Sequence, residues 1–597
     1  MCQIKNIYAG KPDAKDEVTF DGIQRFVEAF IIPENLDVQG LITGDKMFIT
    51  GYKGTGKTAL LYYLDSLLKN NVGEYFSSFI FFKGDFSDTK LQEFEELSKK
   101  LFSYITIDPS VAQEGNDFCY IWRWLFYQRI IEDNRSVNFQ LFENNKAWKD
   151  FESNIANISF AKKKRWLSIP EKIKLSCPVS TPDGSISVAP DIELNFHDSE
   201  AFKTDAYKKF SEIIDCADEK FQKLTRTNYA YYIFIDELEA YFGDDNIFRR
   251  DLKIIRDLIF TVKALNTCFH EHFSTKTKII CSVRTEILNA IYRFVIPKEL
   301  NKVITGYQVA LIWDYTNTNS FSHPILKILT KRIKLAEAKN LSEKELIAKW
   351  FSPQINGIDT PHYILDNGWH KPRDIVRMIL TAQNSICASS SMFDQATFDT
   401  IQKKYSLDSL IEIKEELRAL YSSEEIENIV LLFTGFRIRF SFSELLTRID
   451  QYFSETFIKS NVRRILHDLY RIGFIGNCAQ EAFRWQHRGD DGLIISDDWD
   501  FRVHNALIQA LTLNIHRGTK RAPSFDVVVM KKQNDKLIVR YCTNGTEQWG
   551  HIKISSTSRY YKEITEGKTI RAVHVSYDEH QGVNILRICS AEHTMTE

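Results

Sequence analysis

The chain lacks long apolar runs and clustered cysteines. Its ten cysteines are scattered singly, with no Cys-x-x-Cys pair and no histidine cluster at metal-ligand spacing. This pattern favours buried free thiols over a disulfide framework or a cysteine-based metal site. No apolar run approaches the roughly 20 residues that cross a bilayer, and the opening segment MCQIKNIYAGKPDAKDE has no apolar core of a secretory signal. We therefore expect a soluble, cytoplasmic protein with no membrane partner.

An excess of either charge is also missing. The 597 residues carry a formal net charge of −2, which argues against a wholly basic coat for nucleic acid but leaves local patches open. Hydrophobic residues make up 44% and charged residues 26% of the chain, so a sizeable core is expected. At this length we expect about three to five domains.

One segment differs from this background. Residues 47–64 read MFITGYKGTGKTALLYYL, in which Met47 to Thr50 is a short apolar run typical of a buried parallel strand. The next eight residues match the phosphate-binding pattern G-x-x-x-x-G-K-[ST] at every fixed position. They are Gly51, Tyr52, Lys53, Gly54, Thr55, Gly56, Lys57 and Thr58. A helix is predicted to begin at Ala59, which we include among the nucleotide-binding residues.

The chemistry of phosphate binding explains this spacing. Gly51, Gly54 and Gly56 permit backbone angles that are closed to other residues, so that several N–H groups can converge on phosphate oxygens. The N-terminus of the helix that follows also favours an anion. We predict that Lys57 reaches the β- and γ-phosphates of ATP and that Thr58 binds Mg²⁺ through its hydroxyl group.

An acidic strand end supplies the partner that such a loop needs. The run YYIFIDE at residues 231–237 predicts a strand next to the phosphate-binding strand, with Asp236 at its C-terminal edge. There Asp236 can hold the Mg²⁺ shell, and Glu237 is placed to polarise the attacking water as a general base. The adjacent glutamate favours ATP over GTP, and no convincing N-K-x-D guanine motif is present.

A third apolar strand, residues 278–283, ends at Arg284 and is expected beside the acidic strand. A polar residue there can sense the γ-phosphate. Arg284 is the better candidate for this catalytic role and Ser282 the other, whereas a surface arginine paired with Glu286 is the alternative. Residues 309–313 predict a fourth strand. Four parallel strands with intervening helices predict a doubly wound α/β P-loop NTPase core.

These motifs resemble those of bacterial P-loop ATPases of the AAA+-like, STAND and KAP-like groups, often encoded beside mobile-element or phage-defence genes. The resemblance covers roughly residues 1–515 and rests on GYKGTGKT, on FIDELE with the strand ending SVRTE, and on WHKPRDI at 369–375. The last motif looks like the lid-helix motif of such ATPases. It implies that Arg373 contacts the γ-phosphate from a lid, whereas an exposed arginine on a helix started by Pro372 is the alternative.

Two expectations follow from the resemblance. Asp13, Ala14 and Glu17 become candidates for an N-terminal clasp around the adenine. The gap between Thr58 and Asp236 is about three times that of a minimal ATPase core, which implies an inserted module at about residues 100–225.

The insert and the helix after the acidic strand offer partner surfaces. We expect the insert to have an aromatic core and to contact a partner or effector protein. Its basic run KKKRW at residues 162–166 either contacts a phosphate backbone or is a solvated charged face. The amphipathic helix that follows the acidic strand carries Arg249, Arg250 and Arg256. One of them is an arginine finger in a homo-oligomer, or all three are surface salt-bridge partners.

After an ATPase domain at residues 1–314, the sequence predicts a helical lid at 315–400 and a winged-helix domain at 401–515. Three helices and two wing strands define that domain, at 426–433, 442–453, 457–470, 472–477 and 482–488. Polar residues that suit DNA contact lie on the third helix and the wing, at Lys459, Asn461, Arg463, Arg464, Arg484 and Arg488. Protein contact is the alternative, because Asp468, Asp490 and Asp491 lie nearby.

The last segment, residues 516–597, predicts a linker and a small β-rich module. Its expected strands are 525–530, 537–541 and 571–576. Taken together, the sequence predicts an ATP-hydrolysing molecular switch that couples nucleotide state to a nucleic-acid or protein partner. An ATP-dependent oligomerising scaffold with little turnover, which recruits or controls an effector protein, is the alternative. A role in bacterial anti-phage defence follows from the resemblance alone.

Overall fold

Two compact units make up the chain in the computed structural model. The first contains Met1–Thr434 and Arg439–Thr512, and the second contains Gly435–Ile438 and Leu513–Glu597. The residues described are 4, 7–85, 91, 118–156, 172–175, 178–180, 186–188, 192–195, 203–240, 245–273, 276–295, 300–313, 320–337, 341–386, 391–479, 482–490, 492–514, 525–533, 535–543, 546–553, 564–578 and 583–588. Within these residues, no helix combines the length and the apolar character needed to cross a membrane.

A five-stranded sheet in the order β2-β7-β8-β1-β9 forms the centre of the first unit. All of its neighbouring pairs are parallel. Its strands are β1 (Phe48–Gly51), β2 (Tyr75–Phe81), β7 (Ala230–Asp236), β8 (Thr277–Arg284) and β9 (Gln308–Ala310). The four predicted strands are present. The edge strand β2 was not predicted, and two serines interrupt its apolar pattern.

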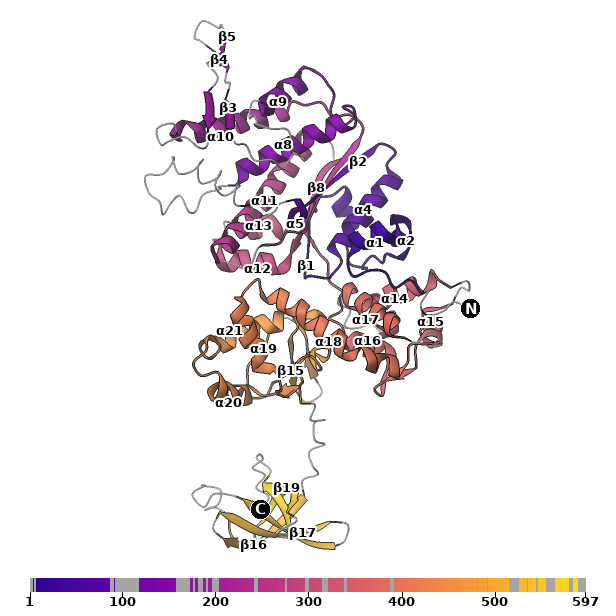
Figure 1. The fold of residues 1–597 in the computed structure, drawn as a ribbon, viewed down its shortest axis with the longest axis vertical. Helices are drawn as coiled ribbons and strands as arrows, with labels where there is room; N and C mark the ends of the chain where they lie inside the picture. The colour runs from indigo at the N-terminus through magenta and orange to yellow at the C-terminus, as the bar shows by residue number, and fades with distance from the viewer. Residues whose placement is uncertain are drawn as a thin grey trace. The chain divides into compact units, whose positions relative to one another are not determined.

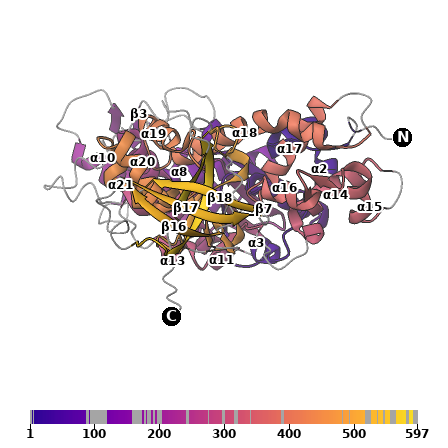
Figure 2. The same ribbon diagram turned by 90° about the horizontal axis from the view of Figure 1, so that it is seen from below.

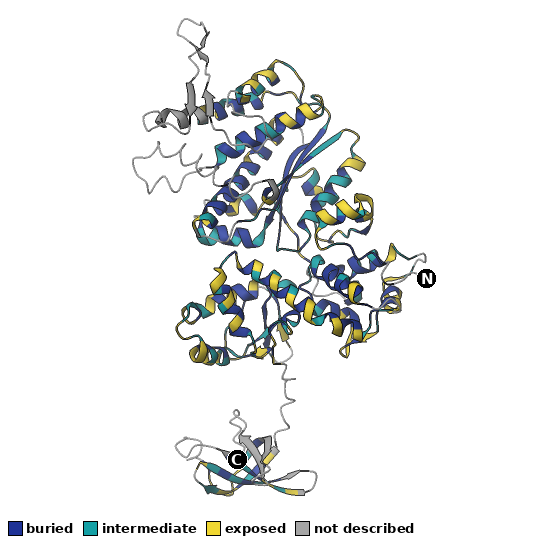
Figure 3. Ribbon diagram, viewed as in Figure 1, coloured by how far each residue is buried: buried dark blue, intermediate teal, exposed yellow. Residues whose placement is uncertain are grey.

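Helices cover both faces of this sheet, as a doubly wound fold requires (Figure 1). One layer contains α1 (Ala14–Asp21), α2 (Ile23–Ala29) and α4 (Lys57–Asn71). The other contains α8 (Cys119–Ser136), α11 (Asp245–His272), α12 (Thr285–Phe294) and α13 (Leu300–Ile304). Buried leucines of α4, spaced three and four residues apart, explain why this segment packs as a helix against the sheet. The central strands β1, β7 and β8 lie buried between the two layers, whereas the edge strands β2 and β9 are only partly buried (Figure 3).

The predicted insert adds helices to one edge of this core. Its described helices are α8, α9 (Lys146–Ala156) and α10 (Lys203–Phe221). The aromatic side chains Trp122, Trp124 and Phe126 of α8 are buried, in agreement with the predicted core role. Two short antiparallel pairs follow, β3 (Lys172–Leu175) with β6 (Ile192–Asn195) and β4 (Pro178–Ser180) with β5 (Ile186–Val188). The basic run 162–166 lies outside the described residues.

Five helices follow the sheet, over the segment predicted as a lid and beyond it. They are α14 (Pro324–Lys334), α15 (Glu343–Trp350), α16 (Thr360–Asp366), α17 (Pro372–Ser385) and α18 (Gln395–Leu417). Because α18 runs through residue 400, it joins the predicted lid to the predicted winged helix as one continuous rod.

The next segment contains three helices and a small antiparallel sheet. The helices are α19 (Ser423–Phe433), α20 (Phe442–Tyr452) and α21 (Phe457–Arg471), close to the predicted bounds. The sheet has the order β12-β15-β13-β14, from β12 (Arg439–Phe440), β13 (Ile475–Ala479), β14 (Ala482–Arg484) and β15 (Asp500–Val503). The second predicted strand is shorter than expected, because a 3₁₀ turn at Gln486–Arg488 follows it.

The second unit contains a closed five-stranded barrel in the order β16-β17-β18-β20-β19. Its strands are β16 (Phe525–Gln533), β17 (Lys536–Thr543), β18 (Thr546–Lys553), β19 (Thr569–Asp578) and β20 (Val583–Ile588). Three of them correspond to the predicted strands, whereas β18 and β20 were not predicted. The first three strands form an antiparallel meander, in which they lie side by side (Figure 2).

Candidate nucleotide site

The loop between β1 and α4 is an open backbone cradle. Gly54 and Gly56 have φ angles of +82° and +95°, which disfavour any residue with a Cβ. Gly51 differs from the prediction, since it has no such angle. Its requirement is steric, because a Cβ there would lie 2.6 Å from the Thr55 Oγ1 atom.

Lys57 and Thr58 occupy the first turn of α4. The Lys57 Nζ donates to the carbonyl oxygens of Gly51 and Tyr52, both at 2.9 Å, so the side chain lies along the loop. Burial lowers the pKa of Lys57 to about 8. The Thr58 hydroxyl donates to Asp236 Oδ2 at 2.5 Å, which brings the two predicted metal ligands together.

Asp236 ends β7, but this strand is not the immediate neighbour of the phosphate-binding strand. The prediction was wrong on this point, because β8 lies between β7 and β1. From β8, the Ser282 hydroxyl donates to Asp236 Oδ1. Ser282 therefore positions the Asp236 carboxylate, whereas the sequence offered it as a sensor of the γ-phosphate.

Glu237 follows directly and lines the same cavity. Its φ angle of +58° is unusual for a residue with a side chain, and such strain is concentrated at functional sites. Burial raises the pKa of its carboxyl group, with a further contribution from Asp236 and opposition from Lys15. Among the described residues, no hydrogen bond or ion pair holds the Glu237 carboxylate, which leaves it able to accept a proton.

Arg284 lies at the end of β8, as predicted, but its partner differs from the expected one. Its guanidinium group donates to Glu239, which also pairs with Lys83 at 2.9 Å. Burial acts to raise the pKa of Glu239, but Arg284 and Lys83 outweigh it and hold this pKa below its usual value. Glu286 accepts instead from the backbone N–H of Lys53 at 2.9 Å, so it supports the loop.

The N-terminal segment closes another side of the cavity. Asp13, Ala14 and Glu17 all line it, and their contact with adenine stays a prediction. The Glu17 carboxylate is already engaged, however, because it accepts from the Tyr8 hydroxyl at 2.5 Å and pairs with Arg332 at 3.0 Å. Asp13 caps α1 by accepting from Lys15 N–H. Glu17 therefore holds the N-terminal segment in place through its contacts with Tyr8 and Arg332.

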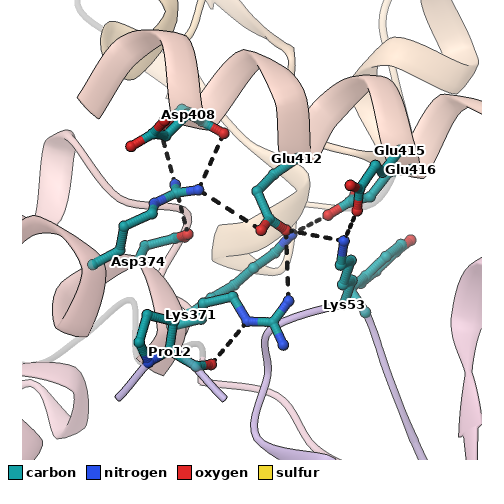
Figure 4. Close-up of polar contacts among 12 residues, drawn as sticks. Pro12, Lys53, Lys371, Asp374, Asp408, Glu412, Glu415 and Glu416 are labelled. Carbon is teal, nitrogen blue, oxygen red and sulfur yellow. Dashed lines mark hydrogen bonds and ion pairs between the residues drawn. The ribbon is translucent and has the colours of Figure 1, made fainter. Parts of the chain in front are cut away.

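Helices α17 and α18 form the opposite side, which we call the lid-side wall. Arg373, at the start of α17, donates to the Pro12 carbonyl at 3.1 Å and pairs with Glu412 of α18 at 3.6 Å (Figure 4). Lys53 of the loop pairs with Glu415 and, at 3.4 Å, with Glu412. The acidic face of α18 thus holds both a loop lysine and the predicted lid arginine.

One buried pair anchors this wall. Lys371 donates to Glu416 Oε1 at 2.8 Å, and both side chains are almost fully buried (Figure 4). Burial raises the pKa of Glu416 to about 7, although Lys371 opposes the shift. The start of α17 also lies close to the phosphate-binding loop, since a Cβ on Gly54 would lie 3.2 Å from Arg373 Cβ.

The loop, Asp236 and Glu237 form the sheet-side wall of a cavity of about 820 Å³, which is within the usual range for small ligands. Eight basic and eight acidic side chains line this cavity. The acids of the lid-side wall therefore pair with basic side chains that would otherwise be available to a phosphate group.

The three arginines of α11 have different surroundings. Arg250 and Arg256 are buried and pair with Asp251 at 2.6 Å and with Asp257 at 2.8 Å. Both predicted alternatives, a finger for a neighbouring subunit and a surface salt bridge, are therefore wrong for these two. Arg249 lies at the surface and donates to the Phe294 carbonyl at 3.3 Å.

Two contacts join this core to α21 and the adjoining sheet. Arg293 of α12 pairs with Asp468 of α21 at 3.2 Å. Trp369, just before α17, donates through Nε1 to the Gly473 carbonyl at 2.8 Å. The C-terminal end of α12 and the residue at the entry to α17 therefore contact α21 and the turn that follows it.

The predicted DNA-contacting residues are divided between two environments. Lys459, Arg463 and Arg464 lie exposed on α21, and Lys459 pairs with Asp450 at 3.0 Å. Asn461 donates to the Phe457 carbonyl within the helix. Arg488 does not extend from a wing strand, because it pairs with Asp366 of α16 at 2.8 Å.

Comparisons with known proteins add little to this geometry. No protein-family profile matches the chain. No curated protein matches it either. A solved structure of the ORC1 protein from Aeropyrum pernix in complex with DNA aligns over 82% of this chain and 96% of that chain, at 11% identity and a TM-score of 0.31. A likeness this distant carries no argument, so fold and function rest on the contacts described above.

Proposed function

We propose that this protein is an Mg²⁺-dependent ATPase that acts as a molecular switch. The observation that carries the proposal is the convergence of the glycine-rich cradle, the Thr58–Asp236 pair and Glu237 on one cavity. These residues come from the ends of separate elements, β1, α4 and β7, at one edge of a parallel sheet. Ligands of open α/β sheets bind at this edge.

The residues fit the groups that the proposal requires. A Cβ-free cradle at Gly54 and Gly56 suits phosphate oxygens, and Lys57 lies within reach of the same loop. Magnesium prefers oxygen ligands and keeps several waters, so one hydroxyl and one carboxylate suffice from the protein. Thr58 and Asp236 would hold it. Bound there, the ion would neutralise charge that develops on the phosphates.

Glu237 would accept the proton of the attacking water. Its half-buried carboxyl has a raised pKa, which brings its basicity closer to neutral pH. Asp236 is held by two hydroxyl groups and is less free to act as a base. The two neighbouring carboxylates therefore serve different roles, one oriented for the metal and the other for the water.

The lid-side wall would report whether phosphate is present. Lys53 and Arg373 are held by Glu412 and Glu415, and an incoming phosphate group competes with these acids for the same cations. Any shift of α18 reaches the next segment directly, because α18 is one rod that ends shortly before α19. Nucleotide binding would thereby change the position of α21.

DNA is the partner that we favour for the output. The segment α19–α21 with its small sheet has the element order of a winged helix, and the exposed side of α21 is basic. An ATP-assembled scaffold with little turnover is the second candidate. It is favoured by the ion pair that holds Arg284 on Glu239, away from a sensing role. Anti-phage defence, as the setting, is supported by the sequence resemblance alone.

The test measures the affinity of the full chain for duplex DNA with and without Mg²⁺-ATP, using Glu237→Gln to slow turnover. We expect ATP to change this affinity by about fivefold or more. Arg293→Ala, which removes the contact with Asp468, should reduce the change while ATP binding persists. Equal DNA affinity with and without bound ATP would contradict the switch and favour the scaffold.

A further inference from the structure

The outer face of the C-terminal barrel carries exposed apolar and basic side chains that the barrel does not need in order to fold. Along β16 and β17, alternate side chains point inward, and Val527, Val529, Leu537 and Val539 are fully buried. Ile552 of β18 completes this part of the interior. The residues between them must face outward, where polar side chains are expected.

Two large apolar side chains of the barrel are exposed, one on this outer face and one at the bulge in β16. Trp549 of β18 is 49% exposed, and Met530, at the bulge of β16, is 38% exposed. The register places Val528, Arg540 and Trp549 directly opposite one another in one row across three strands. Lys531 and Ile538 lie in the next row.

Positive charge accompanies these side chains on the described part of the face. Lys531, Lys536 and Arg540 project from β16 and β17, and the acids on the same described face are Asp526 of β16 and Glu547 of β18, which lies opposite Cys542. Arg540 pairs with Glu547 at 3.0 Å, and both side chains are substantially exposed. Such a surface pair contributes little to stability, so a phosphate group can displace the glutamate.

We infer that this face binds single-stranded nucleic acid, with Trp549 stacked on a base and Arg540 and Lys531 on the backbone phosphates. An exposed indole beside cations offers the two interactions that single strands seek, a flat aromatic surface and a charged track. A duplex cannot use the indole, because its bases are already stacked on one another. An extended peptide is less suited, since it has no flat ring at every repeat.

The position on the fold agrees with the inference but does not carry it. The barrel is a five-stranded Greek key in which β16 pairs with β19 and β18 runs parallel to β20. In barrels of this OB type, the face of the second and third strands is the usual binding surface. Fold alone assigns no function, and Trp549 with its basic neighbours supplies the specific chemistry.

The test uses the full chain and dye-labelled single strands of about 16 nucleotides, an upper site size for one barrel of this kind. Oligothymidine and oligouridine strands distinguish DNA from RNA as the ligand. Fluorescence anisotropy gives the affinity. Trp549→Ala should weaken binding about 5- to 150-fold, the range for loss of one stacked aromatic ring. Trp549→Phe keeps a flat ring and should restore most of it.

Two further variants make the result specific. Arg540→Ala should weaken binding and reduce its dependence on salt, whereas Glu547→Gln should strengthen binding because an acid next to the phosphates is removed. ATP binding should stay unchanged in all of them, which separates this site from the nucleotide cavity. Unchanged single-strand affinity in Trp549→Ala, or equal loss in Trp549→Phe, overturns the inference. Absence of binding to either strand also overturns it and leaves a protein as the occupant.

Discussion

The two walls of the nucleotide cavity are built in different ways. On the sheet-side wall, the backbone of one short loop forms the cradle, and the glycine angles at Gly54 and Gly56 fix its shape. On the lid-side wall, side chains from distant parts of the chain meet in ion pairs, such as Lys53 with Glu415 and Lys371 with Glu416. Backbone geometry changes little when a ligand binds, whereas ion pairs can exchange partners.

This difference suggests a division of labour. The sheet-side wall supplies affinity and chemistry, because its groups are held in place before any ligand arrives. The lid-side wall supplies the response, because a phosphate group can replace Glu412 and Glu415 as the partner of the same cations. Variants of the sheet-side wall should therefore change ATP binding and turnover. Variants of the lid-side wall should change the coupling between ATP binding and the output.

The largest effect is expected from the sheet-side wall. Lys57→Ala removes the cation that lies along the phosphate cradle and should lower ATP turnover about 10²- to 10³-fold, the usual loss when one key charge partner is removed. Lys53→Ala, in the same loop, is the matched control. It should lower ATP turnover by less than about fivefold, because among the described residues the ion pairs of the Lys53 side chain are with Glu412 and Glu415 of the lid-side wall. Similar losses in both variants would show that the two walls are not distinct.

A second variant tests the contact between the walls. Gly54→Ala places a Cβ at a φ of +82° and 3.2 Å from Arg373 Cβ. We expect it to lower the free energy of unfolding by about 1–3 kcal/mol, because the backbone at this position is strained by a Cβ. ATP binding should also weaken, because the added methyl group crowds Arg373 on the lid-side wall. Gly73→Ala, where a Cβ meets no atom of the described residues within 4 Å, should be neutral in denaturant unfolding. Equal stability of the two variants would contradict the expected strain.

The free energy of unfolding should depend on pH, because buried histidines lie next to the lid-side wall. His370, which precedes Lys371, contacts His323 and His487 with ring centroids 4.6 Å and 5.1 Å away. Burial lowers the pKa of His323 to about 4 and holds those of His370 and His487 well below 6.5. The folded state therefore keeps them neutral, while the unfolded chain takes up protons below about pH 6.5. Stability should be complete above that pH and fall as the pH decreases toward 4.

Each buried histidine can contribute up to about 1.4 kcal/mol per pH unit in this window. Denaturant unfolding at pH 7.5 and 5.5 measures the loss. His370→Gln should reduce the pH dependence, and His362→Gln, at an exposed position, should leave it unchanged. A stability that does not vary between these pH values would contradict the burial of neutral imidazoles.

The smallest effect is expected on the lid-side wall itself. A double variant, Glu412→Gln with Glu415→Gln, removes the acids that compete with phosphate for Lys53 and Arg373. ATP should bind about two- to fivefold more tightly, since partly exposed ion pairs are worth up to about 1 kcal/mol. Isothermal titration would measure this change, with Glu424→Gln as an exposed control on α19. Weaker ATP binding in the double variant would indicate that these acids support the site.

The sheet-side wall could be predicted from the sequence because its information is local. Eight consecutive residues contain the cradle, and one strand end supplies Asp236 and Glu237. The strand order was predicted less well, since nothing in the sequence places β8 between the acidic strand and β1. The partner of Arg284 was also missed, because Glu239 and Glu286 are equally plausible from spacing alone.

The lid-side wall could be predicted only in part. The WHKPRDI motif indicated Arg373, but the acids that hold it lie on α18, and Glu415 is 362 residues from its partner Lys53. An acidic helix face usually means solvent exposure, so no pattern in the sequence distinguished this one. Such contacts depend on how helices far apart in the chain pack, which local spacing does not encode.

The central claim is ATP hydrolysis at Glu237. The most direct measurement is phosphate release by the purified full chain with Mg²⁺-ATP, in wild type and in Glu237→Gln. We predict turnover in the wild type and a loss of about 10²- to 10⁴-fold in the variant, the usual contribution of a general base, with ATP still bound. Equal phosphate release from both proteins, or none from the wild type while it binds Mg²⁺-ATP, would contradict hydrolysis at Glu237.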